Sequence, residues 1–311
     1  MEDWEFNMKK QIWTTYEKEL TDFEEHLISF LKTYETEIPK GFFEGISYSL
    51  LLGGKKLRPL FFLKTAEFFG AQKNLAYKLA TAIEIMHTFT LVHDDLPAID
   101  NDDMRRNKPS NHVVFGEDFA IINGDAMLNL AYELILSETA APFSYFKAAS
   151  LIADCLGVKG VLGGQYLDMY YSKQKEKPSG KIVRDIHKNK TAKLFVASIT
   201  GAAILAGIEE KEIEKVKEVS ENIGLLFQSY DDLLDHFASS EEIGKTANKD
   251  LYQNKATYIS VLGIDEAIQI FYKLHEQINS ELILWDKRPL FLIEFIDYLK
   301  DNLKMYIQRA D

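Results

Sequence analysis

Two aspartate clusters are the strongest chemical signal in this sequence. In the first, Asp94, Asp95, Asp100, Asp102 and Asp103 follow directly on the apolar segment 83–92. These carboxylates crowd the C-terminal end of an expected helix, where the helix dipole disfavours each anion by up to about 1 kcal/mol. They also repel one another, so a positive partner should compensate them. Oxygen ligands without histidine or thiol favour a hard divalent cation such as Mg²⁺ or Ca²⁺.

The spacing within the first cluster needs a break in the helix. Asp94 and Asp100 are six residues apart, and on a straight helix they would point about 240° away from each other. Pro97 stands between them and should end or kink the helix there. The sequence therefore predicts that Asp100 swings back toward Asp94.

The second cluster comprises Asp231, Asp232 and Asp235 in an otherwise apolar stretch. Asp231 and Asp235 are four residues apart, so they share one face of a helix. Burying carboxylates among leucines is costly without a cation or a shifted pKa. A solvated acidic helix end would explain either cluster alone. Two clusters, each next to an apolar helix, instead favour a metal site.

Cationic residues at four places complement these carboxylates. They are Lys55, Lys56 and Arg58 after Gly53-Gly54; Arg105 and Arg106; Lys190 beside Thr191; and Lys245 and Lys255. Arginine binds phosphate oxygens in a bidentate way, whereas lysine acts as a point charge. Each group alone would be typical of ordinary surface charge. Carboxylates, a divalent metal and cations together are what the binding of two diphosphate groups requires.

The overall composition narrows the class of protein. The chain has 311 residues, 46% of them hydrophobic, and a formal net charge of −12. Such an acidic chain is a poor candidate for binding nucleic acid or coating an anionic membrane. The N-terminus is acidic and lacks the features of a targeting segment, and the apolar runs read as too short to cross a bilayer. We therefore expect a cytoplasmic protein without stable membrane insertion, in which the single Cys155 is a small buried hydrophobe.

Helical periodicity dominates the chain. The predicted helices cover 4–33, 58–70, 75–95, 118–137, 143–158, 182–206, 210–237, 256–281 and 289–308. Strand alternation bounded by turn pairs is absent, and no Gly/Ser linker divides the chain. We predict an all-α fold of about ten helices, forming one domain over residues 1–311, with the polar loops gathered at one end.

These residues resemble the motifs of one family, the trans-polyprenyl diphosphate synthases of the isoprenoid synthase fold. The matching stretches run in the family order, and they are 53–59, 87–97, 100–106, 111–112, 115–117, 124–125, 163–165, 190–191, 227–235, 244–246 and 254–258. The resemblance implies a single helical bundle around a deep central cavity, usually in a homodimer. It also implies two substrates, isopentenyl diphosphate and a short allylic diphosphate.

The resemblance assigns roles to the residues named above. It implies three Mg²⁺ ions, which Mn²⁺ can replace, held by Asp94, Asp100 and Asp231, with Asp95, Asp232 and Asp235 in support. Lys55, Arg58, His87 and Arg106 match the isopentenyl diphosphate site, and Lys56 stands where the family often has arginine. The residues that match the allylic diphosphate site are Arg105, Lys190, Thr191, Gln228, Lys245 and Lys255.

The implied reaction is ionisation of the allylic diphosphate, condensation and loss of a proton. Thr191 and Gln228 would present oxygens to the cation, and the departed diphosphate would take the proton. Phe89 lies five residues before Asp94, about 7.5 Å down the same helix, where its ring would act as the floor of the chain pocket. In this family, an aromatic residue there together with the longer first aspartate motif resembles bacterial farnesyl diphosphate synthases, so the resemblance implies farnesyl diphosphate (C15) as product. The alternatives are a geranylgeranyl diphosphate (C20) synthase, a non-catalytic regulatory subunit, a terpene cyclase or a plain metal-binding bundle.

Overall fold

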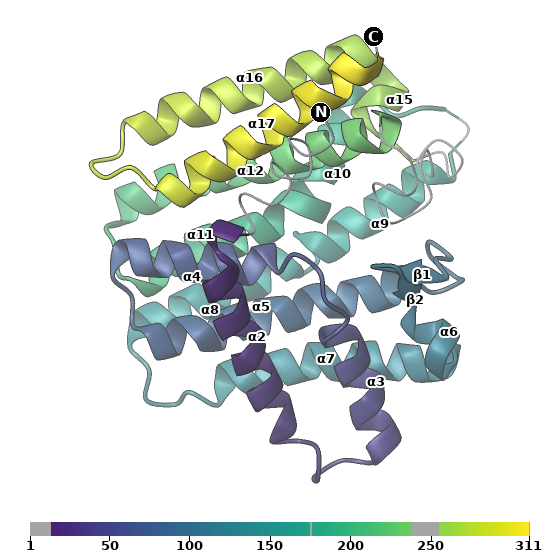
Figure 1. Ribbon diagram of the computed structural model, residues 1–311, viewed down its shortest axis with the longest axis vertical. Coiled ribbons are helices and arrows are strands. Elements are labelled where there is room, and N and C mark those ends of the chain that lie inside the picture. Colours follow the sequence, from purple (N-terminus) through teal and green to yellow (C-terminus); the bar gives the residue numbers. More distant parts are fainter. Residues whose placement is uncertain (1–13, 175, 238–254, 311) are drawn as a thin grey trace.

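The structure, a computed structural model, describes residues 14–174, 176–237 and 255–310, and helices make up most of them (Figure 1). The α-helices are α2 (Glu17–Lys32), α3 (Lys40–Leu50), α4 (Leu57–Phe69), α5 (Lys73–Asp94), α6 (Asn111–Phe115), α7 (Glu117–Leu136), α8 (Phe143–Leu156), α9 (Val161–Ser172), α10 (Gly180–His187), α11 (Lys193–Leu205), α12 (Glu210–Phe237), α15 (Tyr258–Leu262), α16 (Ile264–Ile283) and α17 (Leu290–Ala310). A π-helical segment, η1 (Lys188–Ala192), joins α10 to α11. The all-helical bundle is the predicted fold class.

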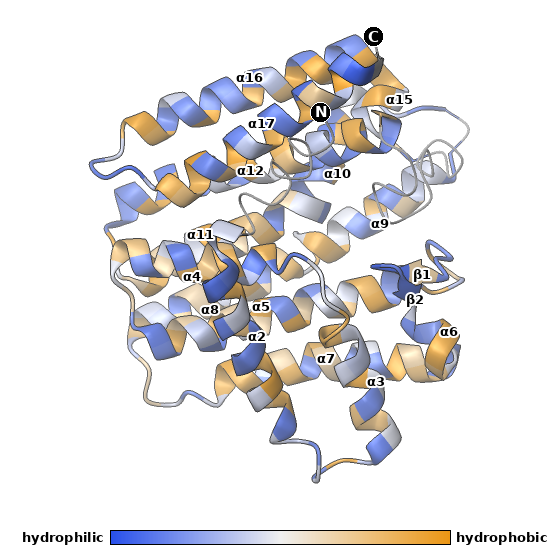
Figure 2. Ribbon diagram, in the orientation of Figure 1, coloured by the Kyte–Doolittle hydropathy of each residue, from blue (hydrophilic) through white to orange (hydrophobic). Residues whose placement is uncertain are grey.

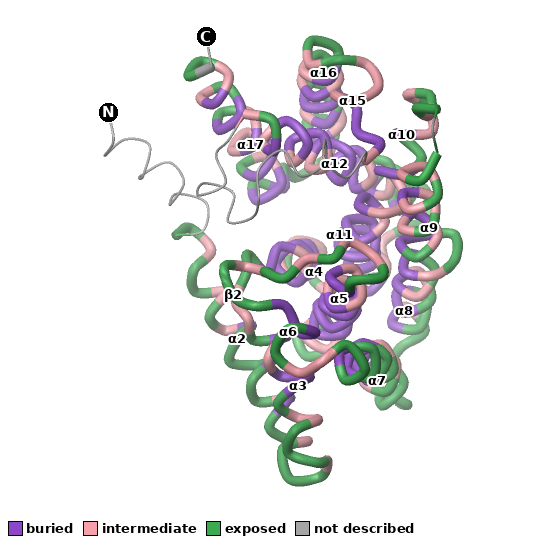
Figure 3. The backbone as a smooth tube through the Cα atoms, turned by 90° about the vertical axis from the view of Figure 1, so that its right-hand side faces the viewer, coloured by how far each residue is buried: buried purple, intermediate pink, exposed green. Residues whose placement is uncertain are grey.

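Two apolar cores lie on either side of α4 and α11. One core joins these two helices to α2, α3, α5, α7 and α8, and the other joins them to α10, α12, α15, α16 and α17. Neighbouring rings of α4 serve both, because Phe62 belongs to the first core and Phe61 to the second. Figure 3 shows α5, α11 and α12 as the most deeply buried parts of the backbone. The apolar stretches of these helices therefore occupy the middle of the bundle.

Some elements differ from the predicted ones. The single helix expected at 182–206 is α10, η1 and α11 in succession. Neither α3 nor α9 was predicted, and both carry two glycines, which lower the helix propensity of a short segment. A two-residue antiparallel ladder, β1 (Met104–Arg105) with β2 (Lys108–Pro109), also went unpredicted. Cys155 is buried, as expected, and burial raises the pKa of its thiol to about 11.

Helix α7 carries an apolar surface. It is the only helix in the described part of the chain that is long and apolar enough to cross a membrane by length and composition, and 39% of its most apolar window is buried. One such helix is weak evidence for a membrane span. It packs against α3, α5 and α6, and hydrophobic residues also mark its length in Figure 2. Its outward residues Phe119, Ile121 and Ile122 are exposed.

Candidate active site

The first aspartate cluster forms a tight turn where α5 ends. The Asp100 amide donates a hydrogen bond to the Asp94 carbonyl oxygen at 2.9 Å, and the Asp102 amide donates to the Asp95 carbonyl oxygen at 3.1 Å. Pro97 lies within this turn, so the helix stops before it. The backbone at Asp100 therefore turns back toward Asp94, as predicted.

Asp94 has an unusual protonation equilibrium. Burial, with the nearby charge of Asp100 as a smaller cause, raises the pKa of its carboxyl to about 6. Lys190, Arg105 and Lys255 act in the opposite direction and lower it. Lys255 also lies close to the second carboxylate, with its Nζ 3.5 Å from Asp100 Oδ2. Two partly buried carboxylates therefore lie close together with several cations around them. Such a site is suited to bind a divalent ion and a phosphate group.

The short β1–β2 hairpin holds Arg105 against the same turn. Its guanidinium Nε donates to Asp95 Oδ1 at 3.1 Å and Nη2 lies 3.6 Å from Asp102 Oδ2. Burial alone would lower the pKa of Arg105, but its hydrogen bond to Asp95 and the charge of that carboxylate raise it above its usual range. Asp95, only 3% exposed, thus anchors Arg105 in the structure. Its role as a metal ligand stays a prediction.

The π-helical segment η1 carries Lys190 and Thr191, and glycines from two helices press on it. A Cβ at Gly164 of α9 would lie 2.2 Å from the Lys190 backbone nitrogen, and one at Gly224 of α12 would lie 2.4 Å from Ala192 Cα. Only glycine permits so close an approach. Single-turn π-helical insertions are frequent at functional sites. The segment is therefore held between α9 and α12 with its polar side chains in a fixed place.

Lys190 is the link between α9 and the first aspartate cluster. Its Nζ lies 2.5 Å from Asp168 Oδ2. Burial alone would lower the pKa of Lys190, but Asp168, Asp94 and Asp100 together raise it above the usual value. The ammonium therefore stays charged at neutral pH, next to the carboxylates that should meet a metal–diphosphate complex.

The second aspartate cluster joins the same region through a chain of hydrogen bonds. Thr191 Oγ1 donates to Gln228 Oε1 at 2.6 Å, and Gln228 Nε2 donates to Asp232 Oδ1 at 2.8 Å. His187 Nε2 lies 3.5 Å from Asp232 Oδ2. Burial lowers the pKa of His187 to about 4, with the charges of Lys190 and Asp231 also acting on it. Both clusters therefore adjoin η1, since Lys190 interacts with the first and Thr191 is linked through Gln228 to the second.

A separate cationic group lies at the start of α4. Arg58 Nη1 is 3.1 Å from His87 Nε2, and the guanidinium of Arg106 donates to the Gly53 carbonyl oxygen. Burial lowers the pKa of Arg58 to about 10, and burial together with Arg58 and Arg106 lowers the pKa of His87 well below its usual value. Cationic groups that are held close together repel one another, and a bound anion would relieve this repulsion.

Gly54 serves this cationic group differently from the way its sequence suggests. Two successive glycines can let the backbone approach an anion closely. In the structure a Cβ at Gly54 would lie 2.3 Å from the Arg106 guanidinium carbon, and Gly54 has a φ of +96°. The glycine therefore makes room for the side chain of Arg106, which crosses the loop.

The donor set also fits Mg²⁺ in a particular way. Among the described residues, no three His, Cys, Asp or Glu side chains already converge as a ready-made metal cage. Mg²⁺ commonly takes one or two carboxylates from the protein, keeps several waters and completes its shell with substrate phosphates. Asp94 and Asp100 on one side, and Asp231 on the other, are carboxylates of that kind. The residues present fit a metal shared with a diphosphate.

Comparison with known proteins agrees with this arrangement. A family model described as polyprenyl synthetase matches residues 40–281. The chain belongs to the polyprenyl synthetase family. It is 38% identical over 273 residues to a geranylgeranyl diphosphate synthase of Cyanophora paradoxa, covering 86% of this chain and 91% of that protein. It is 40% identical over 264 residues to a chloroplastic geranylgeranyl pyrophosphate synthase of Catharanthus roseus, covering 83% and 74%.

A solved structure extends the comparison to the fold. The geranyltransferase of Helicobacter pylori, complexed with magnesium and isoprenyl diphosphate, superposes with a TM-score of 0.76 and 28% identity. The match covers 96% of this chain and 97% of that one. The isoprenoid synthase fold of the polyprenyl synthetase family is therefore shown for this protein.

The structure brings most of the predicted residues together. Asp94, Asp95, Asp100, Arg105, Lys190 and Lys255 form one group; Thr191, Gln228, Asp231 and Asp232 adjoin it; and Arg58, His87 and Arg106 form the second cationic group. Lys55 is exposed at the edge of the latter, and Asp235 is 4% exposed on α12. Lys245 lies outside the described residues.

Three polar residues near this polyprenyl synthetase site received no role from the sequence, although Gln165 lies in the matching motif 163–165. They are Asp168 and Gln165 on α9, and His187 at the end of α10. Both polar atoms of the Gln165 amide are buried without a hydrogen-bond partner in the part of the chain described. The available signal was the segment 163–168, in which two glycines precede a glutamine and an aspartate one turn apart.

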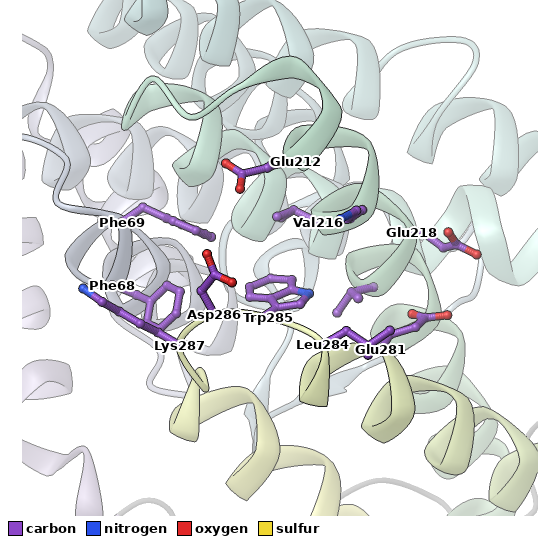
Figure 4. A pocket seen from close by; sticks show the side chains of 12 residues that line it. Phe68, Phe69, Glu212, Val216, Glu218, Glu281, Leu284, Trp285, Asp286 and Lys287 are labelled. Atoms are coloured by element: carbon purple, nitrogen blue, oxygen red, sulfur yellow. The ribbon is translucent and has the colours of Figure 1, made fainter.

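The described part of the chain also has a cavity away from these charged residues. A cavity of about 530 Å³ is lined by Phe68 and Phe69 at the end of α4, by Val216 of α12 and by Trp285 after α16 (Figure 4). Asp231 follows Val216 by fifteen residues on α12, which places the aspartates about 22 Å along that helix. The cavity is therefore at the opposite end of the bundle from the charged residues described above.

Proposed function

We propose that this protein is a magnesium-dependent trans-prenyltransferase that joins isopentenyl diphosphate to a short allylic diphosphate. The observation that carries the proposal is the presence of two cationic groups beside two carboxylate clusters. Lys190, Arg105 and Lys255 surround Asp94, whereas Arg58, His87 and Arg106 form a second group at the start of α4, next to the first. Two anion sites fit a reaction with two diphosphate substrates. The site with the carboxylates would bind the allylic diphosphate, which leaves, and the other site would bind the isopentenyl diphosphate, which keeps its diphosphate group.

The metal site follows from the carboxylates. We assign Asp94, Asp100 and Asp231 as the ligands of three Mg²⁺ ions, with Asp95 and Asp235 in support and Mn²⁺ as a substitute metal. Mg²⁺ held by these carboxylates would supply positive charge to a leaving diphosphate group. The magnesium and isoprenyl diphosphate named for the Helicobacter pylori geranyltransferase support this assignment.

The remaining roles belong to the polar residues of the two sites. Lys190 and Arg105 are tethered by Asp168 and Asp95, so they hold the allylic diphosphate in a fixed orientation without rearranging. The Thr191 hydroxyl donates a hydrogen bond to Gln228 Oε1, so the lone pairs of Thr191 Oγ1 would be left to face the allylic cation. Arg58, His87 and Arg106 would hold the second diphosphate. We assign the departed diphosphate as the base that takes the final proton.

The product is assigned from the relatives. The two relatives compared above carry the name of geranylgeranyl diphosphate synthases, and these findings favour C20 over the C15 product expected from Phe89. We therefore propose geranylgeranyl diphosphate as product, with farnesyl diphosphate as the alternative. Phe89 is 3% exposed, and its ring meets that of His93 edge-on at 5.5 Å between centroids.

Phe89→Ala is expected to lengthen the product by at least one isoprenoid unit relative to the wild type. The substitution removes an aromatic ring about 7.5 Å below Asp94 on α5, on the path that a growing chain would take. Chromatography of dephosphorylated products measures the change. Phe89→Tyr keeps the ring and should leave the product length as it is. An unchanged product from Phe89→Ala would remove Phe89 as the floor of the chain pocket.

We also propose a homodimer. The helices α7, α8 and α9 lie along one side of the molecule (Figure 3), and each exposes large hydrophobic side chains. Examples are Phe119 at 57%, Phe143 at 74% and Tyr166 at 67% exposure. Apolar surface of this extent marks an interface in a soluble protein. Sedimentation equilibrium should give twice the 35.7 kDa of one chain, and a monomer at micromolar concentration would contradict the proposal.

Location remains a prediction. The sequence favours the cytoplasm, whereas the Catharanthus roseus relative is named as chloroplastic. We keep the cytoplasm as the proposal, with a plastid as the alternative, and propose that residues 1–311 form one domain. Fractionation of cells expressing the chain with a C-terminal tag tests the location. Recovery of the protein with plastids would overturn it.

The central test is turnover with isopentenyl diphosphate and dimethylallyl, geranyl or farnesyl diphosphate, with and without Mg²⁺. We expect metal-dependent elongation that stops at C20. A non-catalytic subunit would bind without turnover, a terpene cyclase would release hydrocarbons or alcohols from the allylic substrate alone, and a plain metal-binding bundle would do neither. Any of these outcomes would replace the proposed activity.

A further inference from the structure

A buried ion pair lies directly behind the second cationic group. Lys56 Nζ is 2.9 Å from Glu84 Oε1, and the two side chains are only 2% and 1% exposed. The same Nζ donates to the Leu50 carbonyl oxygen at 2.9 Å. Lys56 therefore does not face a ligand, although its place in the sequence suggested a further cation for phosphate. Because buried ion pairs contribute little to the stability of the fold, we expect this pair to have a role other than stabilisation.

The pair fixes the loop that carries the cationic residues. Lys56 has a left-handed backbone with φ of 44° and is the N-cap residue of α4, directly after Lys55 and two residues before Arg58. A non-glycine residue rarely adopts this conformation, and it persists where its surroundings hold it. The bonds from Lys56 to Glu84 and to the Leu50 carbonyl are the contacts that do so.

The pair also runs alongside the Arg58–His87 contact. Glu84 and His87 are three residues apart on α5, so they lie on one face of that helix. Lys56 and Arg58 flank Leu57 at the start of α4. Two contacts therefore join the start of α4 to one turn of α5. They are Lys56 to Glu84 at 2.9 Å and Arg58 to His87 at 3.1 Å. A shift of Lys56 would move Arg58 relative to its partner.

Glu84 has an electrostatic effect as well. Burial lowers the pKa of both Arg58 and Arg106, and the carboxylate of Glu84 raises both. Arg106 also lowers the pKa of Arg58, and Arg105 lowers that of Arg106. The carboxylate is thus an anion that offsets a group of cations while the diphosphate is absent. Neutral His87 lies within the same group.

We propose that Lys56 and Glu84 are positioning residues for the second diphosphate site. They hold Lys55, Arg58 and His87 in the arrangement that binds isopentenyl diphosphate, without touching it. This inference rests on the proposed prenyltransferase function. It predicts that substitutions in the pair weaken the binding of isopentenyl diphosphate. The binding of the allylic diphosphate at the aspartate clusters should stay unchanged.

The test is steady-state kinetics with each substrate varied in turn. Glu84→Gln and Lys56→Met should raise KM for isopentenyl diphosphate by between about 10- and 100-fold, the effect of a small misplacement of binding groups. KM for the allylic diphosphate should change by less than about twofold. Lys56→Arg can keep both hydrogen bonds and should retain most of the affinity. Lys78→Met removes another short ion pair of α5, to Glu138 at 2.7 Å, and should leave both constants unchanged.

A double variant, Lys56→Met with Glu84→Leu, keeps the test valid where single variants fail to fold. It replaces the buried pair with apolar side chains of similar volume, a change that proteins often tolerate. We expect it to melt near the wild type while KM for isopentenyl diphosphate stays raised. A wild-type KM in this folded double variant would overturn the positioning role. An inactive wild type would instead overturn the proposed function.

Discussion

Asp94→Asn is expected to abolish prenyl transfer and, at the same time, to stabilise the metal-free protein above pH 6. The two effects have one cause. The carboxylate lies in a partly buried place next to Asp100, where its charge is disfavoured until a cation arrives. Asparagine has no charge to bury, and it is a poor ligand for the metal that the charge would hold.

The pH range of the stability gain follows from the pKa of Asp94. Burial raises it in the folded chain to about 6 from an ordinary value of 3.8. Below pH 4 the carboxyl is protonated in both states, so the substitution should have little effect on unfolding. As the pH rises from about 4 to 6, the unfolded chain loses its proton first, and the free energy of unfolding of the wild type falls.

The magnitude is largest above pH 6. A shift of about two pKa units corresponds to about 3 kcal/mol, and the partial exposure of Asp94 reduces this to about 1–2 kcal/mol. Calorimetry in a chelator at pH 4 and pH 7.5 measures the difference in Tm. Asp154→Asn, an exposed aspartate on α8, is the matched control and should shift neither Tm nor rate.

The catalytic loss should be at least about 10³-fold in kcat, since a bound divalent ion supplies several kcal/mol to the transition state. Two results would contradict the assignment of Asp94. One is a folded Asp94→Asn variant with a normal rate, and the other is a variant that is less stable than the wild type at pH 7.5. The first would remove the metal role, and the second would show that the charge is not under strain.

The aspartate turn illustrates what local sequence can establish. Pro97 and the six-residue spacing of Asp94 and Asp100 were sufficient to predict a helix end and a return of the chain, because both depend on residues close in sequence. The apolar pattern of α5 and α12 likewise predicted buried helices. The second cluster was expected near the first only through the family resemblance, because no local rule relates residue 94 to residue 231.

The residues that sequence reasoning misjudged depend on contacts between distant elements. Lys56 reads as a surface cation until α5 brings Glu84 to it. Gly54 reads as an anion-binding glycine until Arg106 occupies its space. The π-helical segment interrupts a helix whose apolar periodicity is continuous. Its cause is the pressure of α9 and α12 on either side, which no window of the sequence contains.

Gly224→Ala is the second substitution for which we expect a large effect. Alanine normally stabilises a helix by about 1 kcal/mol relative to glycine. Here the added Cβ would lie 2.4 Å from Ala192 Cα and 2.6 Å from Ala192 Cβ, where the backbone of η1 must give way. We expect a net loss of about 1–3 kcal/mol in the free energy of unfolding, the usual cost of overpacking.

The same displacement should reach the chemistry. Gly224 lies one turn before Gln228 on α12, and Ala192 directly follows Thr191, so forcing these two helices apart stretches the 2.6 Å hydrogen bond between Thr191 Oγ1 and Gln228 Oε1. A misplacement of this size costs about 10²-fold in rate. Measuring kcat well below the Tm of the variant separates this loss from unfolding.

Gly201→Ala on α11 is the matched control for that experiment. Its Cβ would meet Phe62 at 3.4 Å and Ile152 at 3.6 Å, at the edge of ordinary packing distance from side chains that can adjust. It should therefore keep the wild-type rate and a similar Tm. A Gly224→Ala variant that behaves in the same way would mean that η1 yields without cost. The close approach of α12 would then no longer explain why Lys190 and Thr191 lie in a π-helical turn between the two aspartate clusters.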